Sequence, residues 1–235
     1  MKTRFNRITG YRRISAVILL LSLSAAAISA YSDPEWDPLS YKGNFFVMLE
    51  PAGPFEPDVY DEDKALKQLL DEARYVFSGM IYGFEFDYIP KDIDREIDEE
   101  FSLKPVYTLP WGDQRLSVST GAYEDGRYTA ELRYDVSEEQ MPWVSSWDTN
   151  ILPDVTAAGE GSLYEGFEGK KEAIENSVKE SLRSYLRPRI YDKPSRITGK
   201  ARLAGIPYII MDEGKYRCTA KITLRIDEIL EYRAY

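Results

Sequence analysis

Histidine is absent from all 235 residues of the chain. Its absence excludes the Ser-His-Asp and Cys-His nucleophilic systems and removes the commonest protein ligand for zinc, copper and iron. The sequence also lacks a glycine-rich phosphate loop of either common spacing. We therefore expect no catalytic residue, no bound metal and no cofactor.

Cysteine is almost absent, since Cys218 is the single example. One cysteine cannot form an intramolecular disulfide, so stability must come from a hydrophobic core. Cys218 alternates with polar residues in the same register as Tyr216 and Ala220, which places it on the buried side of a strand. Because a reactive thiol needs exposure and a basic neighbourhood, we interpret Cys218 as a small buried hydrophobe.

Long apolar runs are also lacking, apart from one near the start of the chain. Residues 1–30 begin with basic residues, continue with a short apolar run and end in small residues, with no acid among them. This pattern predicts a cleaved signal peptide, with cleavage after Ala27 or Ala30, and an uncleaved anchor is the alternative. We therefore expect a periplasmic or extracellular protein with no membrane span in the mature chain.

Positive charge is scarce, with 30 Lys and Arg against 40 Asp and Glu. Removal of residues 1–30 takes away five bases and no acids, which leaves 25 bases and 40 acids and a net charge of −15. Such an acidic chain is unsuited to binding nucleic acid over its surface. The remaining length is enough for one large domain or two small ones.

The first half of the mature chain changes its periodicity several times. An apolar run at residues 44–49 predicts a strand, and apolar spacing of three and four over residues 61–80 predicts a helix. Residues 82–88 alternate aromatic side chains with glycine and acids, which predicts a strand with one aromatic face. Between residues 90 and 101, an apolar residue at every fourth position among acids predicts a short amphipathic helix.

Two β-hairpins are predicted by strict alternation around a glycine turn. One occupies residues 207–227 and the other residues 124–136, and both turns read acid-acid-Gly-base-Tyr. A predicted helix from about Lys170 is broken at Pro188. A helix, a Lys-Pro pair, a strand and a glycine hairpin thus occur twice.

This order predicts an α+β fold of two helix-plus-antiparallel-sheet modules, with a possible internal duplication, after the signal peptide. The alternative is that two hairpins converged on ordinary turn chemistry. We expect a signal peptide at 1–30, a first module at 31–136 with an N-terminal strand and an acidic helix insertion, a linker or long loop at 137–169, and a second module at 170–235.

Two groups of side chains are candidates for contacts with a partner. Trp143 and Trp147, in the predicted linker, are candidates for an aromatic contact surface. Seven bases between residues 183 and 202, with a single acid among them, form what we call the basic strip, a candidate contact for an anionic partner. The alternative is that these bases complement the dipole at the end of a helix and pair with acids of the first module. The strip consists of Arg183, Arg187, Arg189, Lys193, Arg196, Lys200 and Arg202.

Carboxylates offer weaker candidates. Residues 92–98 carry acids at alternate positions, as a calcium loop does, but Ile97 stands where that loop needs glycine. Glu85 and Asp87, on the aromatic strand, could serve a glycan hydrolase that uses two carboxylates. We expect instead an exported, non-catalytic binding or scaffolding module for envelope proteins, an anionic glycan or its own copies. The alternatives are that hydrolase and a carrier that holds a small ligand on the aromatic face of residues 82–88.

Overall fold

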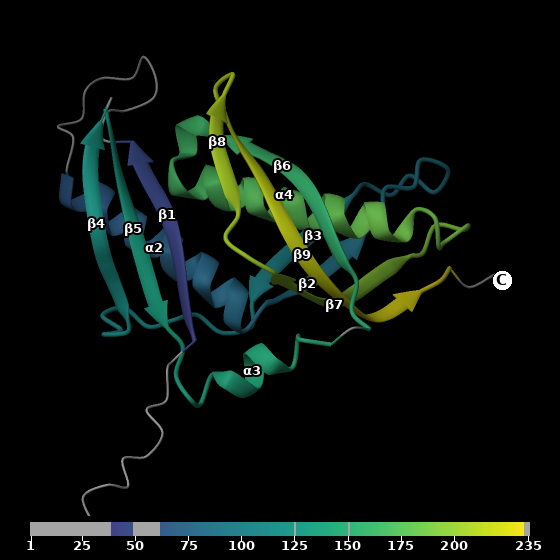
Figure 1. Ribbon diagram of the computed structural model, residues 1–235. Coiled ribbons are helices and arrows are strands. Elements are labelled where there is room, and N and C mark those ends of the chain that lie inside the picture. Colours follow the sequence, from purple (N-terminus) through teal and green to yellow (C-terminus); the bar gives the residue numbers. More distant parts are fainter. Residues whose placement is uncertain (1–38, 49–61, 125, 150, 233–235) are drawn as a thin grey trace, which may run out of the picture. The chain divides into compact units, whose positions relative to one another are not determined.

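The computed structural model describes residues 39–48, 62–124, 126–149 and 151–232. These residues belong to one unit, Pro38–Tyr235, which we describe by itself (Figure 1). The expected signal peptide, residues 1–30, lies outside the described residues. The unit combines helices with antiparallel strands, with more strand than helix, so the predicted α+β class is confirmed.

The strands form two antiparallel sheets. The three-stranded sheet has the order β1-β5-β4, and the six-stranded sheet has the order β3-β2-β7-β9-β6, with β8 also paired to β9. The strands are β1 (Ser40–Met48), β2 (Phe84–Ile89), β3 (Glu100–Pro105), β4 (Leu116–Glu124), β5 (Arg127–Asp135), β6 (Asp154–Ser162), β7 (Arg196–Leu203), β8 (Tyr208–Asp212) and β9 (Lys215–Leu230).

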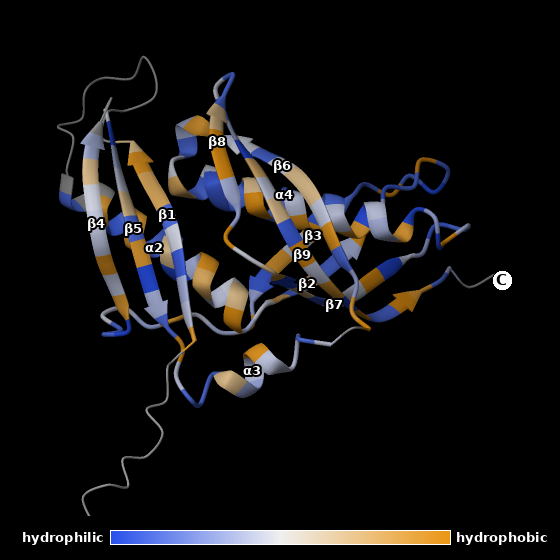
Figure 2. Ribbon diagram, viewed as in Figure 1, coloured by the Kyte–Doolittle hydropathy of each residue, from blue (hydrophilic) through white to orange (hydrophobic). Residues whose placement is uncertain are grey.

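Two long helices supply the other side of the core. Helix α2 (Glu62–Ile81) packs against β1, and helix α4 (Phe167–Leu186) packs against β6 and β9 (Figure 1). Both helices carry apolar residues at three- and four-residue spacing, and Figure 2 shows these positions as bands on otherwise polar ribbons. Two short elements, α3 (Met141–Ser145) and the 3-10 helix η1 (Leu163–Glu165), complete the described helices.

The hairpin predicted at residues 207–227 is confirmed as β8 and β9. Its turn contains Glu213 and Gly214 at φ of 48° and 77°, the left-handed values that a tight hairpin turn requires. Along β9, alternate side chains from Tyr216 to Leu224 are buried, including Cys218. The aromatic strand is confirmed as well, because Phe84, Phe86 and Tyr88 of β2 are buried at alternate positions.

The acidic helix predicted between residues 90 and 101 is wrong. The chain turns back on itself there, with a bridge between Asp92 and Ile97, and Glu96 adopts a φ of 56°. Ile93 is 74% exposed, so no helical face lies on the core. Phe101 instead pairs with Tyr88 across β2 and β3. Strand pairing with a distant part of the chain outweighs the local fourfold pattern.

The predicted linker at residues 137–169 is also wrong. It contains α3, all of β6, η1 and the first residues of α4. Strand β6 pairs with β9 along its whole length, from Asp154 opposite Thr223 to Ser162 opposite Lys215. A Cβ at Gly159 or Gly161 would overlap the backbone of α4, so the small residues that resemble a loop permit a close approach of the helix.

The two halves of the unit share a connectivity. In the first, β1 is followed by α2 and then by the hairpin β4-β5, whose second strand pairs with β1. In the second, β6 is followed by α4 and then by the hairpin β8-β9, whose second strand pairs with β6. We call these the first and second βαββ units. Strands β2 and β3 are inserted into the first unit and β7 into the second, and all three join the six-stranded sheet.

Candidate functional site

The basic strip is divided by the structure into paired and unpaired cations. Four of its seven bases form salt bridges with acids: Arg183 with Glu99 and Glu180, Arg196 with Asp87, Lys200 with Glu85, and Arg202 with Asp148. Most of these acids belong to the first half of the chain. For these four bases, the alternative of internal pairing describes the structure better than a free contact surface does.

Strand register produces two of the pairs. Strand β7 runs antiparallel to β2, with Lys200 directly opposite Glu85. The Lys200 Nζ lies 3.0 Å from a Glu85 oxygen, and the Arg196 Nε donates a hydrogen bond of 2.8 Å to Asp87. The Arg196 hydrogen bonds lower the pKa of Asp87. The two acids singled out for hydrolysis are therefore both held by cations.

Arg183 ties the end of α4 to the hairpin β2-β3. Its Nε donates a hydrogen bond of 3.1 Å to the Tyr88 hydroxyl, and its other nitrogens contact Glu99 and Glu180. The Tyr88 hydroxyl in turn donates a hydrogen bond of 2.8 Å to Glu99. Burial raises the pKa of Tyr88, whereas the bonds to Tyr88 and Arg183 outweigh burial at Glu99 and lower its pKa.

The other three bases of the strip, Arg187, Arg189 and Lys193, form no salt bridge with any residue that the structure describes. All three lie within residues 187–193, immediately after α4. Arg189 donates a hydrogen bond of 2.6 Å to the Tyr185 carbonyl and covers the Tyr185 ring, so it caps the end of the helix. Arg187 and Lys193 are exposed.

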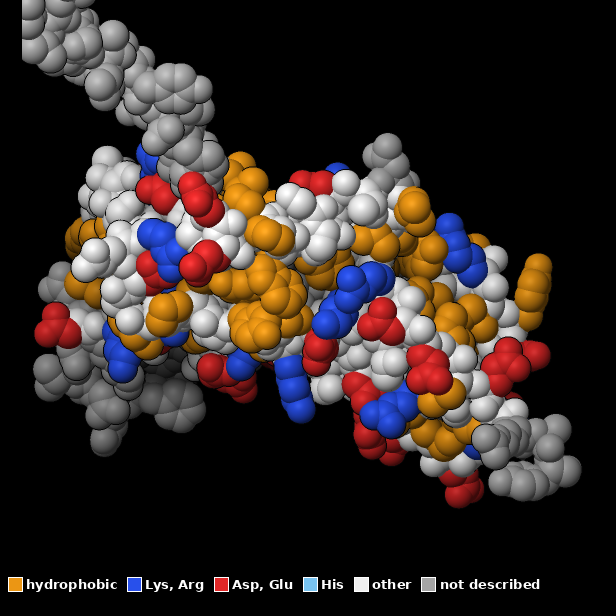
Figure 3. Space-filling view, turned by 90° about the horizontal axis from the view of Figure 1, so that it is seen from below, with side chains coloured by type: hydrophobic (Ala, Val, Ile, Leu, Met, Phe, Trp, Pro, Cys, Tyr) orange, Lys and Arg blue, Asp and Glu red, His pale blue; other side chains and the backbone are white. Residues whose placement is uncertain are grey.

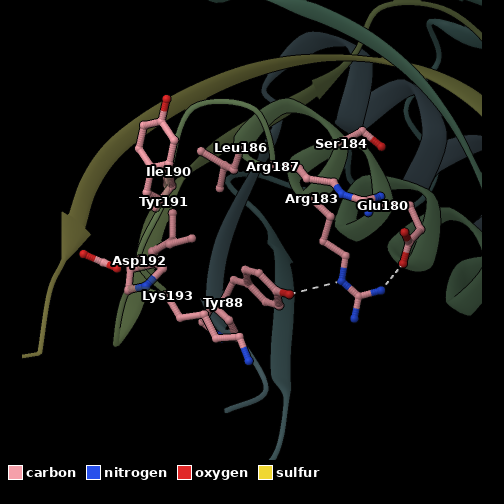
Figure 4. A pocket seen from close by; sticks show the side chains of 13 residues that line it. Tyr88, Glu180, Arg183, Ser184, Leu186, Arg187, Ile190, Tyr191, Asp192 and Lys193 are labelled. Atoms are coloured by element: carbon pink, nitrogen blue, oxygen red, sulfur yellow. Dashed lines mark hydrogen bonds and ion pairs between the residues drawn. The ribbon is translucent and has the colours of Figure 1, made fainter. Parts of the chain in front are cut away.

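A pocket of about 380 Å³ opens between the end of α4 and the segment that follows it (Figure 4). Its buried apolar lining includes Tyr88 of β2, Leu186 of α4 and Ile197 of β7. Arg187 and Lys193, which form no salt bridge with the described residues, also line it. The site thus combines an apolar interior with positive charge that no acid of the described chain neutralises by a salt bridge.

The pocket lining as a whole has a net positive charge. Arg183 lines the pocket but is paired with Glu180, which lines it too. Asp192 is the other acid of the lining, and in Figure 4 its carboxylate points away from Arg183 and Arg187. Three bases and two acids line the pocket in total. An anionic group is therefore favoured over a cationic one.

Trp143 and Trp147 behave differently from one another. Trp143 is 37% exposed and forms an edge-to-face cluster with Tyr82 and Tyr107, at centroid distances of 5.7 and 5.2 Å. Figure 3 shows hydrophobic side chains gathered on the face that carries α3. Trp147 is only 4% exposed and packs over Gly83, so its inclusion in an exposed contact surface was wrong.

Other chemical candidates are buried or dispersed. Cys218 is completely buried, as predicted, and desolvation raises its pKa to about 12, so the thiol stays protonated. Among the residues that the structure describes, no three acids and cysteines are grouped closely enough to hold a metal ion. Within the same residues, no helix has the length and apolarity needed to cross a bilayer.

Sequence analysis missed one buried ion pair. Lys170 of α4 and Glu72 of α2 are 3% and 6% exposed, and their charged atoms lie 2.6 Å apart. Lys170 also donates a hydrogen bond to the Phe46 carbonyl, and its Nζ lies 3.7 Å from the centre of the Phe46 ring. Each residue sits among other charged residues in its own helix, so no local pattern marks the pair.

The fold and the pocket define an antiparallel α+β protein with a basic-rimmed cavity at one helix end. A protein-family model matches residues 38–232, and the chain belongs to the family that this model describes. The chain is also similar to an uncharacterized protein of Treponema pallidum (strain Nichols), with 20% identity over 167 residues, which cover 71% of this chain and 70% of that protein. No solved structure matches the chain.

Proposed function

We propose that the protein is an exported, non-catalytic binding module that recognises an anionic group of an envelope component. The observation that carries this proposal is a division within the basic strip: four bases form salt bridges, and the three that form none with the described residues all lie in residues 187–193. In a mature chain with an expected net charge of −15, this segment of three bases and one acid offers a local net positive charge to a partner.

Export is supported by the basic, apolar and small-residue order of residues 1–30. The family match begins at residue 38, after both expected cleavage positions. The proposed partner is therefore another envelope protein, an anionic glycan or a second copy of this chain. The pairing of Glu85 with Lys200 and of Asp87 with Arg196 favours binding over the carboxylate hydrolase.

The proposal can be tested by affinity capture of the tagged protein from its own cells. Simultaneous Arg187→Glu, Arg189→Glu and Lys193→Glu substitutions should reduce recovery of the captured partner at least tenfold, because three attractive contacts become repulsive. Lys42→Glu is the matched control, since Lys42 is an exposed base of β1 without a salt bridge to any described residue. Equal recovery with the triple variant and with the control would refute the proposal.

We also propose that the two βαββ units arose by internal duplication. Their shared connectivity supports this, and so does the equivalent register at their turns, where Arg127 lies opposite Met48 and Lys215 lies opposite Ser162. Gly126 and Gly214 occupy the same turn position, at φ of 73° and 77°. A comparison of sequence profiles built separately for each unit from many relatives should then align these glycines. Profiles that match no better than those of unrelated hairpins would count against duplication.

A further inference from the structure

We propose that the pocket after α4 holds a small amphiphile with one negative charge. The apolar part would lie against Tyr88, Leu186 and Ile197, and the anionic group would lie at the rim, beside Arg187 or Lys193. The inference rests on the proposed binding function and specifies the chemistry of the ligand.

The size of the pocket limits the ligand. A volume of about 380 Å³ is near the lower end of the range of roughly 300–1,000 Å³ found for small-molecule sites. The pocket therefore suits one short acyl chain or one ring system better than a polymer segment.

The interior of the pocket favours an apolar body. Tyr88, Leu186 and Ile197 are 5%, 7% and 1% exposed, so they form a fixed part of the core and do not depend on a ligand for their position. The Tyr88 hydroxyl is already bonded to Arg183 and Glu99, which leaves the ring as the part of Tyr88 that contributes apolar surface. Contact with these groups removes apolar ligand surface from water, which is the main source of affinity in such sites.

The cations at the rim of the pocket favour a ligand with a negative charge. Arg187 is the C-cap residue of α4, and Lys193 lies at the other end of the segment 187–193, before β7. Neither forms a salt bridge with a described residue, whereas Arg183, the third base, is held by Glu99 and Glu180. An anionic group could thus contact either cation without breaking an ion pair between described residues. A cationic group would meet a lining of three bases and two acids, whose net charge repels it.

The test uses three probes with the same alkyl chain: decanoate, decanol and decylamine. Isothermal titration of the protein without its N-terminal 30 residues, and of the full chain, should show decanoate binding at least tenfold more tightly than decylamine, with decanol between them. The Arg187→Glu, Lys193→Glu double variant should weaken decanoate binding at least tenfold and reduce the preference for the anion.

Two further variants test whether the probes bind in the pocket. Lys42→Glu is again the matched charge control, because Lys42 is an exposed base of β1 that does not line the pocket, and it should leave decanoate affinity within about twofold. Ser184→Trp places a large ring at an exposed lining position without altering the buried core, so it should block all three probes. Unchanged thermal unfolding of these variants would show that they remain folded.

Equal affinity for decanoate and decylamine, or decanoate binding that Ser184→Trp leaves unchanged, would overturn the inference. Absence of binding by all three probes would overturn it as well. If partner capture nevertheless depends on residues 187–193, the proposed function survives and only the ligand class is wrong. If capture also fails to respond to charge reversal, both are wrong.

Discussion

The two βαββ units have the same connectivity, but their helices pack on their sheets through residues of very different size. In the second, β6 presents Gly159 and Gly161 to α4, and the helix backbone approaches so closely that a Cβ at either glycine would overlap it. In the first, the equivalent register positions of β1 are Phe45 and Val47, both buried. Phe77 of α2 packs edge-on against Phe45, at a centroid distance of 5.6 Å.

This difference shows that one topology accepts two interlayer spacings, provided that each gap is filled. Close backbone contact gains many dispersion contacts without large side chains, whereas aromatic rings fill a wider gap and bury more apolar surface. The second strands of the two hairpins also differ in side-chain size. Leu132 and Tyr134 of β5 stand at the positions that the smaller Ala220 and Ile222 occupy in β9. The first unit should therefore be sensitive to the loss of a large core side chain, and the second to the enlargement of a small one.

The largest expected effect lies where the helices of the two units meet. Lys170→Met should lower the free energy of unfolding by about 3–5 kcal/mol, because Glu72 would be left buried without its partner. Burial lowers the pKa of Lys170 and raises the pKa of Glu72, so each charge depends on the other to remain in the core. Urea unfolding measures the change.

The control for this prediction is the double variant Lys170→Met, Glu72→Leu. It should recover most of the lost stability, because replacement of a complete buried ion pair by apolar side chains is often neutral or stabilising. A double variant as unstable as the single one would show that the pair contributes through geometry that apolar residues cannot replace.

A loss of similar size is expected from removal of the aromatic filling of the first unit. Phe45→Ala should cost about 3–5 kcal/mol of unfolding free energy, since it removes the edge contact with Phe77 and leaves a cavity between β1 and α2. Differential scanning calorimetry would record the loss as a lower Tm. A loss below about 1 kcal/mol would mean that the first unit collapses around the gap and does not require the ring.

The second unit should show the reverse sensitivity. Gly161→Ala adds one methyl group against the Gly169 carbonyl of α4 and should cost about 1–3 kcal/mol through overpacking. Gly112→Ala is a partial control for added bulk, because a Cβ there meets nothing within 4 Å, although its φ of 75° adds backbone strain. Wild-type stability in the Gly161 variant would contradict the close packing inferred for this unit.

The smallest expected effect concerns acid sensitivity. The Arg115 hydrogen bonds lower the pKa of Asp113 beside the three-stranded sheet, and the Lys221 hydrogen bond lowers the pKa of Asp154 in β6. A lowered folded-state pKa gives stability that is present above the ordinary aspartate pKa of about 4 and is lost as the pH falls through the folded-state value. Both contributions should therefore disappear in acid.

Asp113 should matter more than Asp154, because its side chain is 7% exposed and that of Asp154 is 43% exposed. In thermal melts at pH 7, the Tm of Asp113→Asn and that of Asp154→Asn should both be lower than the wild-type Tm, with the larger decrease for Asp113→Asn. At pH 3 the difference in Tm between each variant and wild type should be smaller. A gap that stays constant with pH would show that the carboxylate charges are not responsible.

Local patterns were sufficient to predict some elements. The hairpin around Gly214 and the aromatic strand from Phe84 are predicted by the alternation of apolar and polar residues, because one face of each strand is buried and the other faces solvent. Strand β6 gave no such signal: its buried positions at the end next to α4 are glycines, which resemble a loop. The turn at residues 91–99 was mistaken for a helix because the pairing of Phe101 with Tyr88 depends on a strand elsewhere in the chain.

The candidate site was predictable in composition but not in geometry. All seven bases of the strip are visible in the sequence, yet nothing local shows that Lys200 pairs with Glu85 while Arg187 forms no salt bridge within the described part of the chain. Likewise, Trp143 and Trp147 are four residues apart, and packing against distant residues such as Gly83 buries the second. Burial and pairing depend on which distant segment lies opposite each side chain.

The amino-acid sequence by itself determined the α+β class, the alternating burial along the hairpins and the lack of histidine and disulfide chemistry, because these follow from residue types and short-range periodicity. Tertiary structure alone decided which cations remain unpaired, where the pocket opens and how the two βαββ units meet at Lys170 and Glu72. The physical reason is that charge neutralisation and enclosure require contacts between segments far apart in the chain, and residue order specifies these only through the complete fold.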